Sequence, residues 1–401
     1  MIYATLITLL SLLISLRISK NIFAPATIVS GLWLFCILAF NLYPHDLFPL
    51  KGQFYTGISI WVGVFTLSCL LTQSIFQKPN NIDDPNQSLV NLYFLITIIT
   101  FPYVLWNIYN LLKNAGLLNN VFYNLRSAAL GNIKGLEEGT AKNYFAPLWI
   151  VTYLIELQHF KKERIWIFIS LLLINLSWVF LIMSKLSFLI ICVSTLMILF
   201  FKKIIKTKII LISLAVLFIF FSYFQMLRST QSEINNKELN YDMFTLYVLS
   251  GMPAFETVKP NSSEFFGQNS FRFFYAIGYK TGLTNKKPAR PVLEFINIDK
   301  NNKTHTNVYT TLYPFFKDFG YKGIFIFAFL IGIFYGYIFK KATKKDNPMV
   351  ITYSILVVSL VTQFMNEATL TTLSFLLQIL IFAHLPYWVN KKITIQNTVE
   401  N

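Results

Sequence analysis

The stretch that organises this sequence is His305–Gly323, HTNVYTTLYPFFKDFGYKG. It closes a long polar segment that begins near residue 227, and it leads directly into an apolar run that begins near residue 321. Because an apolar run of helical length is expected to enter a bilayer, the polar side chains just before it should lie at or near the membrane surface. These polar residues are His305, Thr306, Asn307, Tyr309, Lys317 and Asp318.

The composition of the whole chain favours the same interpretation. Hydrophobic residues make up 55% of the 401 residues and charged residues 13%, about half the charged share of soluble domains. The apolar residues form blocks of about 16–24 residues, the length that spans a hydrocarbon core of roughly 30 Å. We therefore expect an all-α, polytopic integral membrane helix bundle with about 11 transmembrane helices and two larger periplasmic loops. The expected helices are 2–18, 22–43, 54–76, 89–112, 143–160, 165–183, 186–201, 207–226, 321–339, 348–366 and 369–389.

Lysine and arginine residues predict the orientation of these helices. They concentrate on alternate connections, which therefore lie on one side, and the positive-inside rule makes that side the cytoplasm. The basic residues on this side are Arg17, Lys20, Lys78, Lys161, Lys162, Arg164, Lys202, Lys203, Lys206, Lys208, Lys340, Lys341, Lys344, Lys345, Lys391 and Lys392. The chain then divides into N-terminal transmembrane helices (1–112), a first large periplasmic loop (113–142), central transmembrane helices (143–226), a main periplasmic loop (227–320), and C-terminal transmembrane helices with a short cytoplasmic tail (321–401).

The net charge of +16 has the same explanation. Lysines that anchor cytoplasmic loops account for it, so nucleic-acid binding is not expected. The three cysteines lie inside apolar runs, which predicts no disulfide framework. The first apolar run is expected to remain as a helix rather than to act as a cleaved signal peptide.

Three segments carry local predictions. Apolar residues at helical spacing predict an amphipathic surface helix within 113–142. The apolar segment 243–251 is too short to span a membrane, so it is expected to dip into the membrane or to pack on the bundle. Glu156 falls inside an expected helix, where a charge is costly unless paired, and Lys161 or Lys162 is its expected partner.

The stretch from Thr306 onwards resembles the end of the main external loop in O-antigen polymerases of the Wzy type (oligosaccharide repeat unit polymerases). In that family a TN-x-Y element precedes DFG-x-x-G and a helix with further spaced glycines. The matching residues here are Thr306, Asn307, Tyr309, Asp318, Phe319, Gly320, Gly323, Gly332 and Gly336. The resemblance covers this motif, the plan of the helices and the two outer loops.

The resemblance implies a glycosyltransferase of the bacterial inner membrane, with its active site facing the periplasm. Its substrates would be oligosaccharide repeat units on undecaprenyl diphosphate. The growing chain would move from its lipid diphosphate to the next lipid-linked unit and release undecaprenyl diphosphate, as a step of lipopolysaccharide O-antigen biosynthesis. The implied partners are this lipid-linked oligosaccharide, membrane lipids, and a chain-length regulator and a flippase; no cofactor is implied.

This chemistry assigns roles to outer residues. A diphosphate leaving group needs cations, and arginine suits phosphate oxygens because it binds them through two parallel hydrogen bonds. The candidates for diphosphate or substrate binding are Arg126, Arg228, Arg272, Arg290, Lys185, Asn307 and Tyr309, with Glu367 as a weaker candidate for acceptor binding.

An acceptor hydroxyl must also lose its proton, and two residues are candidates for the base. His305 is the only histidine of the main loop, and the ordinary pKa of histidine suits this role. Asp318 is the rival base, although an aspartate at this position is also expected to cap the following helix. No metal-binding motif is evident.

Three other function classes remain open. An O-antigen ligase has a similar plan with a different pattern of external histidine and arginine. A polysaccharide flippase or other transporter usually has short loops, inverted repeats and polar residues at mid-membrane, whereas this chain concentrates polarity in its external loops. A structural membrane protein would not need clustered outer arginines.

Overall fold

The computed structural model describes residues 1–75, 84–114, 142–182, 185–210, 212–213, 244–289, 293–301 and 304–399. This part of the chain is mostly helical, with one short antiparallel pair of strands, β1 (Ile296–Asn297) and β2 (His305–Thr306). Within it, seven helices are long and apolar enough to cross a membrane. The prediction of a mostly helical chain with apolar helices of membrane-spanning length is confirmed, while the number of about 11 such helices and the two periplasmic loops stay predictions. The expected helix 207–226 lies mostly outside the described residues.

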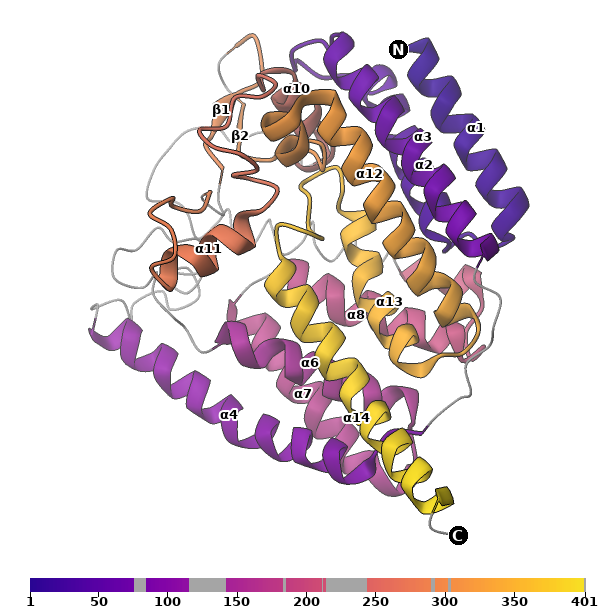
Figure 1. Cartoon of the computed structure of the whole chain (residues 1–401). Coiled ribbons are helices and arrows are strands. Elements are labelled where there is room, and N and C mark those ends of the chain that lie inside the picture. Colours follow the sequence, from indigo (N-terminus) through magenta and orange to yellow (C-terminus); the bar gives the residue numbers. More distant parts are fainter. Residues whose placement is uncertain are drawn as a thin grey trace. The chain divides into compact units, whose positions relative to one another are not determined.

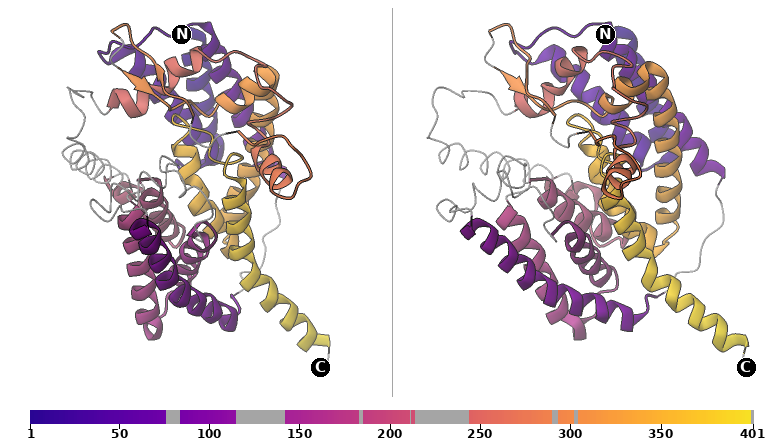
Figure 2. Two further views of the ribbon diagram at one scale, coloured as in Figure 1. Left: turned by 90° about the vertical axis from the view of Figure 1, so that its left-hand side faces the viewer. Right: turned by 60° about the vertical axis from the view of Figure 1, so that its left-hand side comes forward.

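The chain folds into two compact units, each assembled from separate stretches of sequence (Figures 1 and 2). Unit 1 consists of Met1–Lys78, Ser222–Lys340 and Ser359–Ser374, and unit 2 of Pro79–Phe221, Lys341–Val358 and Phe375–Asn401. The helices, in chain order, are α1 (Ile2–Ser19), α2 (Pro25–Leu42), α3 (Gly52–Ile75), α4 (Gln87–Asn114), α6 (Lys142–Gln158), η1 (Lys162–Arg164), α7 (Ile165–Ile182), α8 (Lys185–Phe201), η2 (Thr245–Leu249), α10 (Gly251–Glu256), α11 (Arg272–Lys280), α12 (Tyr313–Thr343), α13 (Asn347–Val361) and α14 (Leu373–Val399).

In unit 1, α1, α2 and α3 lie side by side (Figure 1), and α1 has the burial pattern of a lipid-facing helix. Its buried side chains are small or polar, Ala4, Thr8, Ser11 and Ser15, while Leu10 is 55% exposed. In water this arrangement would be unfavourable, because leucine gains most from burial. In a bilayer it is the expected one, since lipid tails solvate leucine and small residues let helices approach closely.

The spaced glycines of α12 are packing residues. A Cβ atom on Gly332 would lie 2.7 Å from the carbonyl oxygen of Phe65, and one on Gly336 would lie 2.6 Å from that of Cys69. Both distances are too short for a side chain, so α12 and α3 contact each other backbone to backbone. This is the close crossing that glycines four residues apart permit between membrane helices.

Gly320 and Gly323 bend α12 near its beginning. Gly320 has φ 59° and ψ −149°, a backbone conformation that favours glycine, and it interrupts the helical geometry. A Cβ atom on Gly323 would lie 2.3 Å from the carbonyl oxygen of Phe315, so the two segments flanking the bend touch. The glycines of the DFG-x-x-G element therefore have structural reasons to be there.

The short apolar segment before α10 packs on the helices of unit 1. Within η2, Val248 and Leu249 are buried, and η2 contacts α2 while α10 contacts α3. A Cβ atom on Gly251 would lie 2.6 Å from the carbonyl oxygen of Phe364. Of the two expected alternatives for 243–251, packing on the bundle is confirmed.

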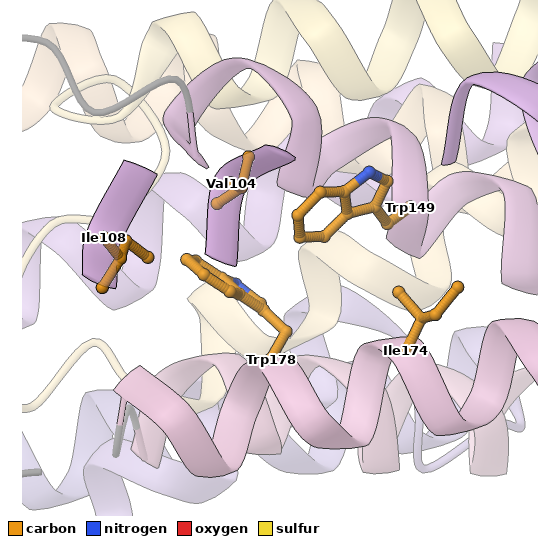
Figure 3. Close-up of a cluster of buried hydrophobic side chains, with 5 residues drawn as sticks. All are labelled: Val104, Ile108, Trp149, Ile174 and Trp178. Atoms are coloured by element: carbon orange, nitrogen blue, oxygen red, sulfur yellow. The ribbon is translucent and has the colours of Figure 1, made fainter. Parts of the chain in front are cut away.

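Unit 2 has its own apolar core between α4, α6 and α7 (Figure 3). The core consists of Val104, Ile108, Trp149, Ile174 and Trp178. The two indole rings lie edge to face with centroids 5.5 Å apart. The Trp149 indole N–H donates to the Thr100 hydroxyl at 3.0 Å, so the polar atom of this buried ring is satisfied.

Candidate functional site

One end of unit 1 is built by connections that are far apart in sequence. Leu47 forms an isolated antiparallel bridge with Asp299, and the Phe48 N–H donates to the Ile298 carbonyl at 2.9 Å. The Thr311 N–H donates to the Gln363 carbonyl at 2.8 Å. The connection between α2 and α3, the segment before α12 and the turn between α13 and α14 therefore meet here, and we call this region the loop end of unit 1.

Asp318 organises part of the loop end. Its carboxylate accepts hydrogen bonds from the backbone N–H groups of Asn269 (3.1 Å) and Ser270 (2.7 Å). It also accepts from the Asn269 amide at 2.7 Å and from the Ser263 hydroxyl. These donors hold the segment 263–270 against the beginning of α12. The expected cap of the following helix is thus replaced by a cap on a different segment.

Three more carboxylates at the loop end also bind backbone N–H groups. Glu256 accepts from Lys51 at 2.8 Å and Phe54 at 3.0 Å, at the beginning of α3. The buried Asp299 accepts from the N–H of Thr304 at 2.6 Å. Each of these side chains stabilises a turn or a helix end by satisfying N–H groups that the local fold leaves unpaired.

Glu367, a candidate for acceptor binding, is also buried. It is 4% exposed and accepts from the N–H groups of Thr369 (2.7 Å), Leu370 (2.9 Å) and Thr371 (2.8 Å). Burial raises the pKa of the Glu367 carboxyl, and the three backbone donors oppose that rise. Its geometry is that of a carboxylate closing the turn between α13 and α14.

His305 and Asn307 differ from these carboxylates. His305 is exposed, Thr306 is buried and Asn307 is half-buried. The Thr306 hydroxyl lies 3.1 Å from the Ser250 hydroxyl inside the fold. Among the described residues, neither His305 nor Asn307 has a side-chain hydrogen bond. They are polar groups that remain available to a ligand.

Tyr309, two residues after Asn307, is buried. The side chain is 7% exposed, and its ring lies 4.8 Å from that of Tyr313. Its hydroxyl donates to the Glu294 carbonyl at 3.4 Å. Burial raises the pKa of Tyr309 to about 12, so this residue donates hydrogen bonds rather than acting as a base.

Of the four candidate arginines, Arg272 is the one within the described residues. It begins α11 and is half-buried, and its buried Nε has no hydrogen-bond partner among the described residues. Burial lowers the pKa of its guanidinium. An arginine in this state is a ready donor for an anion, because a buried N–H without a partner costs free energy.

Several predicted positions lie outside the described residues. These are Arg126, Arg228, Arg290 and the predicted amphipathic helix within 113–142. The backbone of Lys185 is described as the first residue of α8, but its side chain is not. The structure therefore describes the side chains of His305, Asn307 and Tyr309 along one segment. It also shows how Asp318 holds the segment 263–270, which precedes Arg272.

The loop end also contains a buried polar centre that the sequence did not reveal. The Gln363 side-chain oxygen accepts from the Trp33 indole at 3.0 Å and from the Trp61 indole at 3.1 Å. All three side chains are buried. The partners lie about 300 residues apart along the chain, so no sequence spacing indicates the contact.

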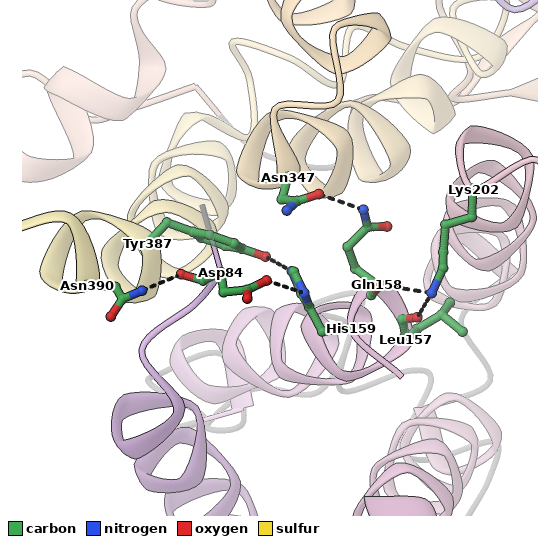
Figure 4. A network of polar contacts seen from close by, with 8 residues as sticks. All are labelled: Asp84, Leu157, Gln158, His159, Lys202, Asn347, Tyr387 and Asn390. Carbon is green, nitrogen blue, oxygen red and sulfur yellow. Dashed lines mark hydrogen bonds and ion pairs between the residues drawn. The ribbon is translucent and has the colours of Figure 1, made fainter. Parts of the chain in front are cut away.

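At one end of unit 2, polar groups join several of the connections that were expected on the cytoplasmic side (Figure 4). The Lys202 ammonium donates to the carbonyls of Leu157 (3.1 Å) and Gln158 (2.8 Å), at the end of α6. The Gln158 amide donates to the Asn347 side chain at 2.8 Å. His159 lies 3.0 Å from the Tyr387 hydroxyl. We call this region the basic end of unit 2.

The prediction that Lys161 or Lys162 pairs with Glu156 is wrong. Glu156 is 4% exposed, and its carboxylate pairs with the guanidinium of Arg164 through both Nε and Nη2. Lys161 and Lys162 are exposed instead. Arg164 is the better partner because its planar group matches both carboxylate oxygens, and η1 turns it back towards α6.

Comparison of the chain with known proteins identifies no family for it. The chain matches no protein-family model, no curated protein and no solved structure.

Proposed function

We propose that this chain is an O-antigen polymerase of the inner membrane, a lipid-diphosphate-dependent glycosyltransferase acting at the periplasmic face. The proposal rests on the resemblance of the 306–336 motif and on one observation at the loop end. The side chain of His305 is exposed, that of Asn307 is half-buried, and neither has a hydrogen-bond partner among the described residues. The carboxylates of Asp318, Glu256, Asp299 and Glu367 instead accept from backbone N–H groups.

In this mechanism the acceptor hydroxyl loses its proton to His305. The acceptor oxygen forms a bond to the anomeric carbon of the growing chain, and the bond from that carbon to the diphosphate oxygen breaks. Undecaprenyl diphosphate leaves with the electron pair. Asn307 and Tyr309 position the acceptor sugar. Arg272, with Arg126, Arg228 and Arg290, neutralises the diphosphate, and Asp318 keeps Arg272 in place by holding the segment before α11.

The proposed topology has about eleven spans, with the basic end of unit 2 in the cytoplasm and the loop end of unit 1 in the periplasm. The grouping of Lys202, His159 and Asn347 at one end of unit 2 supports it, since their connections were expected on a common side. Reporter fusions near Asn261 should indicate the periplasm, and fusions near Lys206 and Lys344 the cytoplasm. A cytoplasmic signal at Asn261 would contradict the topology and the site together.

His305→Ala tests the chemistry. Polymerisation should fall by about two to four orders of magnitude, the usual loss on removing a general base. Cells should then display lipopolysaccharide with one repeat unit in place of a ladder of chain lengths. Lys300→Ala, which changes an exposed residue of the same connection, is the matched control and should leave the ladder intact. Asn307→Ala should shorten the ladder by weakening acceptor binding.

The same gel separates the alternatives. Loss of all O-chain sugar from the lipid A core in the His305→Ala strain would indicate a ligase instead of a polymerase. A normal ladder from His305→Ala, with a lost ladder from Asp318→Asn at normal protein levels, would assign the base to Asp318. Normal ladders from both variants would refute the proposed site, and Lys185 and Glu367 would be the next residues to change.

A further inference from the structure

The helix α11 turns its apolar side away from the protein. At helical spacing, Phe273, Phe274 and Ile277 fall on one side with Lys280 at its edge, and Arg272 and Ala276 fall on the other. Phe274 is 59% exposed and Ile277 is 45% exposed, while Arg272 on the opposite side is half-buried. A helix on a water-exposed surface normally does the reverse. The outward side of α11 therefore requires an apolar environment.

Residues beside α11 extend this apolar surface. Phe266, before the helix, is 73% exposed, and Leu283, after it, is 84% exposed. Together with Phe273, Phe274 and Ile277 they form what we call the α11 face. Isolated exposed apolar residues are common on proteins, but a cluster of this kind marks a contact surface.

Ring contacts place the beginning of α11 where α12 becomes apolar. The Phe271 ring lies 6.2 Å from that of Phe319 and 5.9 Å from that of Phe327. Phe327 belongs to the part of α12 that follows the Gly320 bend. That part also carries lipid-facing side chains such as Phe325, which is 53% exposed. The α11 face is thus anchored at the level where α12 begins its apolar run.

Basic residues flank the α11 face. Lys280 ends the helix, and Lys286 and Lys287 follow in the next turn, all three exposed. The Lys286 ammonium lies 5.2 Å from the centroid of the Phe265 ring. Two exposed acidic residues, Glu264 and Glu294, lie in the segment 264–294, where Lys280, Lys286, Lys287 and Arg272 outnumber them, so the local balance is positive. An aromatic face bordered by lysines is typical of helices that lie in the headgroup region of anionic membranes.

We propose that α11 is an interfacial anchor, which lies along the membrane surface at the Gly320 end of α12 and inserts Phe274 and Ile277 among anionic phospholipids. Its lysines bind the lipid phosphates, and its aromatic side chains enter the boundary between headgroups and acyl chains. The anchor fixes the depth of the segment 263–272, which Asp318 holds. This role does not depend on the enzymatic activity of the chain.

Spin labelling of the full chain in nanodiscs tests the proposal. The label is placed at Ile277→Cys, after replacement of Cys36, Cys69 and Cys192 by alanine. Two control positions calibrate it: Leu10→Cys on the lipid-facing side of α1, and Asn301→Cys in the exposed turn before β2. Accessibility to oxygen, which partitions into lipid, is compared with accessibility to a water-soluble nickel chelate.

The expected oxygen-to-nickel ratio at position 277 is several-fold above that at position 301 and approaches that at position 10. It should rise further when phosphatidylglycerol is added to phosphatidylcholine nanodiscs. Nickel accessibility equal to that at position 301 would overturn the proposal, because the α11 face would then lie in water. A label protected from both reagents would also overturn it, since protein or a bound polyprenyl chain would cover the face.

If the cysteine-free protein does not fold, the variant Ile277→Trp of the otherwise native chain can test whether the α11 face lies in lipid. Its additional fluorescence, relative to the unmodified chain, should be quenched by lipids brominated on the acyl chain and little affected by aqueous iodide. The opposite order of quenching would refute membrane insertion of α11.

Discussion

The loop end of unit 1 and the basic end of unit 2 differ in which backbone groups need a partner and in the charge of the side chains that supply one. At the loop end, turns and helix beginnings leave N–H groups unpaired, and the carboxylates of Asp318, Glu256 and Glu367 accept from them. At the basic end, α6 finishes with unpaired carbonyls, and the Lys202 ammonium donates to them. The sign of a polar side chain at a helix end therefore follows from which backbone groups are left open there.

The comparison also separates structural charges from available ones. A carboxylate that already accepts several hydrogen bonds is needed for folding, and removing it exposes the donors it served. The side chains of His305 and Asn307 form no such hydrogen bonds among the described residues. The strongest tests therefore remove a charge at one end and ask whether folding or activity is lost.

The largest effect is expected at Asp318. Asp318→Ala leaves the N–H groups of Asn269 and Ser270 without their acceptor and should lower the free energy of unfolding by about 4 kcal/mol. Thermal unfolding of the purified protein in detergent measures this loss. Glu264→Ala, at an exposed carboxylate nearby, should change the unfolding temperature little. Equal stability of the two variants would remove Asp318 from its organising role.

A slightly smaller effect is expected for Glu156, a buried carboxylate of unit 2 that pairs with a guanidinium. Glu156→Gln leaves Arg164 without its ionic partner and should cost about 3 kcal/mol. Glu163→Gln, at the exposed neighbour within η1, is the matched control. If Glu156→Gln unfolds at the same temperature as Glu163→Gln, the pair contributes nothing and the comparison holds only for backbone contacts.

His159 predicts a dependence of stability on pH. Burial lowers the pKa of His159 to about 4, the nearby Asp84 opposes this, and Lys202 and Lys161 add to it. Because the folded state holds the imidazole neutral, its contribution is complete above the unfolded pKa of about 6.5 and is lost as pH falls towards 4. At roughly 1.4 kcal/mol for each pKa unit, the loss should reach about 3 kcal/mol near pH 4.

Unfolding temperatures of the intact protein and of His159→Gln, measured between pH 7.5 and pH 4, test this expectation. The difference between the two proteins should shift in favour of the glutamine variant as pH falls. A constant difference across this range would show that the charge of His159 is not linked to folding.

The smallest effect is expected at Lys202. Lys202→Met removes two donors from the carbonyls of Leu157 and Gln158 but keeps the aliphatic stem, and it should cost about 1 kcal/mol because the group is partly solvated. Lys206→Met, at an exposed lysine of the same connection, should have no measurable effect. A lysine at position 202 that proves as dispensable as Lys206 would mean that water satisfies these carbonyls equally well.

The sequence by itself determined the class of the chain and the approximate course of its helices. An apolar run of helical length is a local property, so the predicted helices 2–18, 22–43 and 54–76 agree with α1, α2 and α3. The spaced glycines after Gly320 were visible too. Their use in the crossing of α12 with α3 was not, because a close approach depends on which backbone lies opposite.

The tertiary structure alone decided which polar groups are engaged. Asp318 serves residues about fifty positions earlier in the chain, and Gln363 receives two indoles from α2 and α3. Glu156 pairs with Arg164 because η1 redirects the chain, where spacing favoured the nearer lysines. The exposure of the apolar side of α11 is likewise a feature that only the tertiary structure shows. Composition fixes how much apolar or charged surface a segment carries, but hydrogen bonding and burial depend on where the chain returns, and only the folded backbone specifies that.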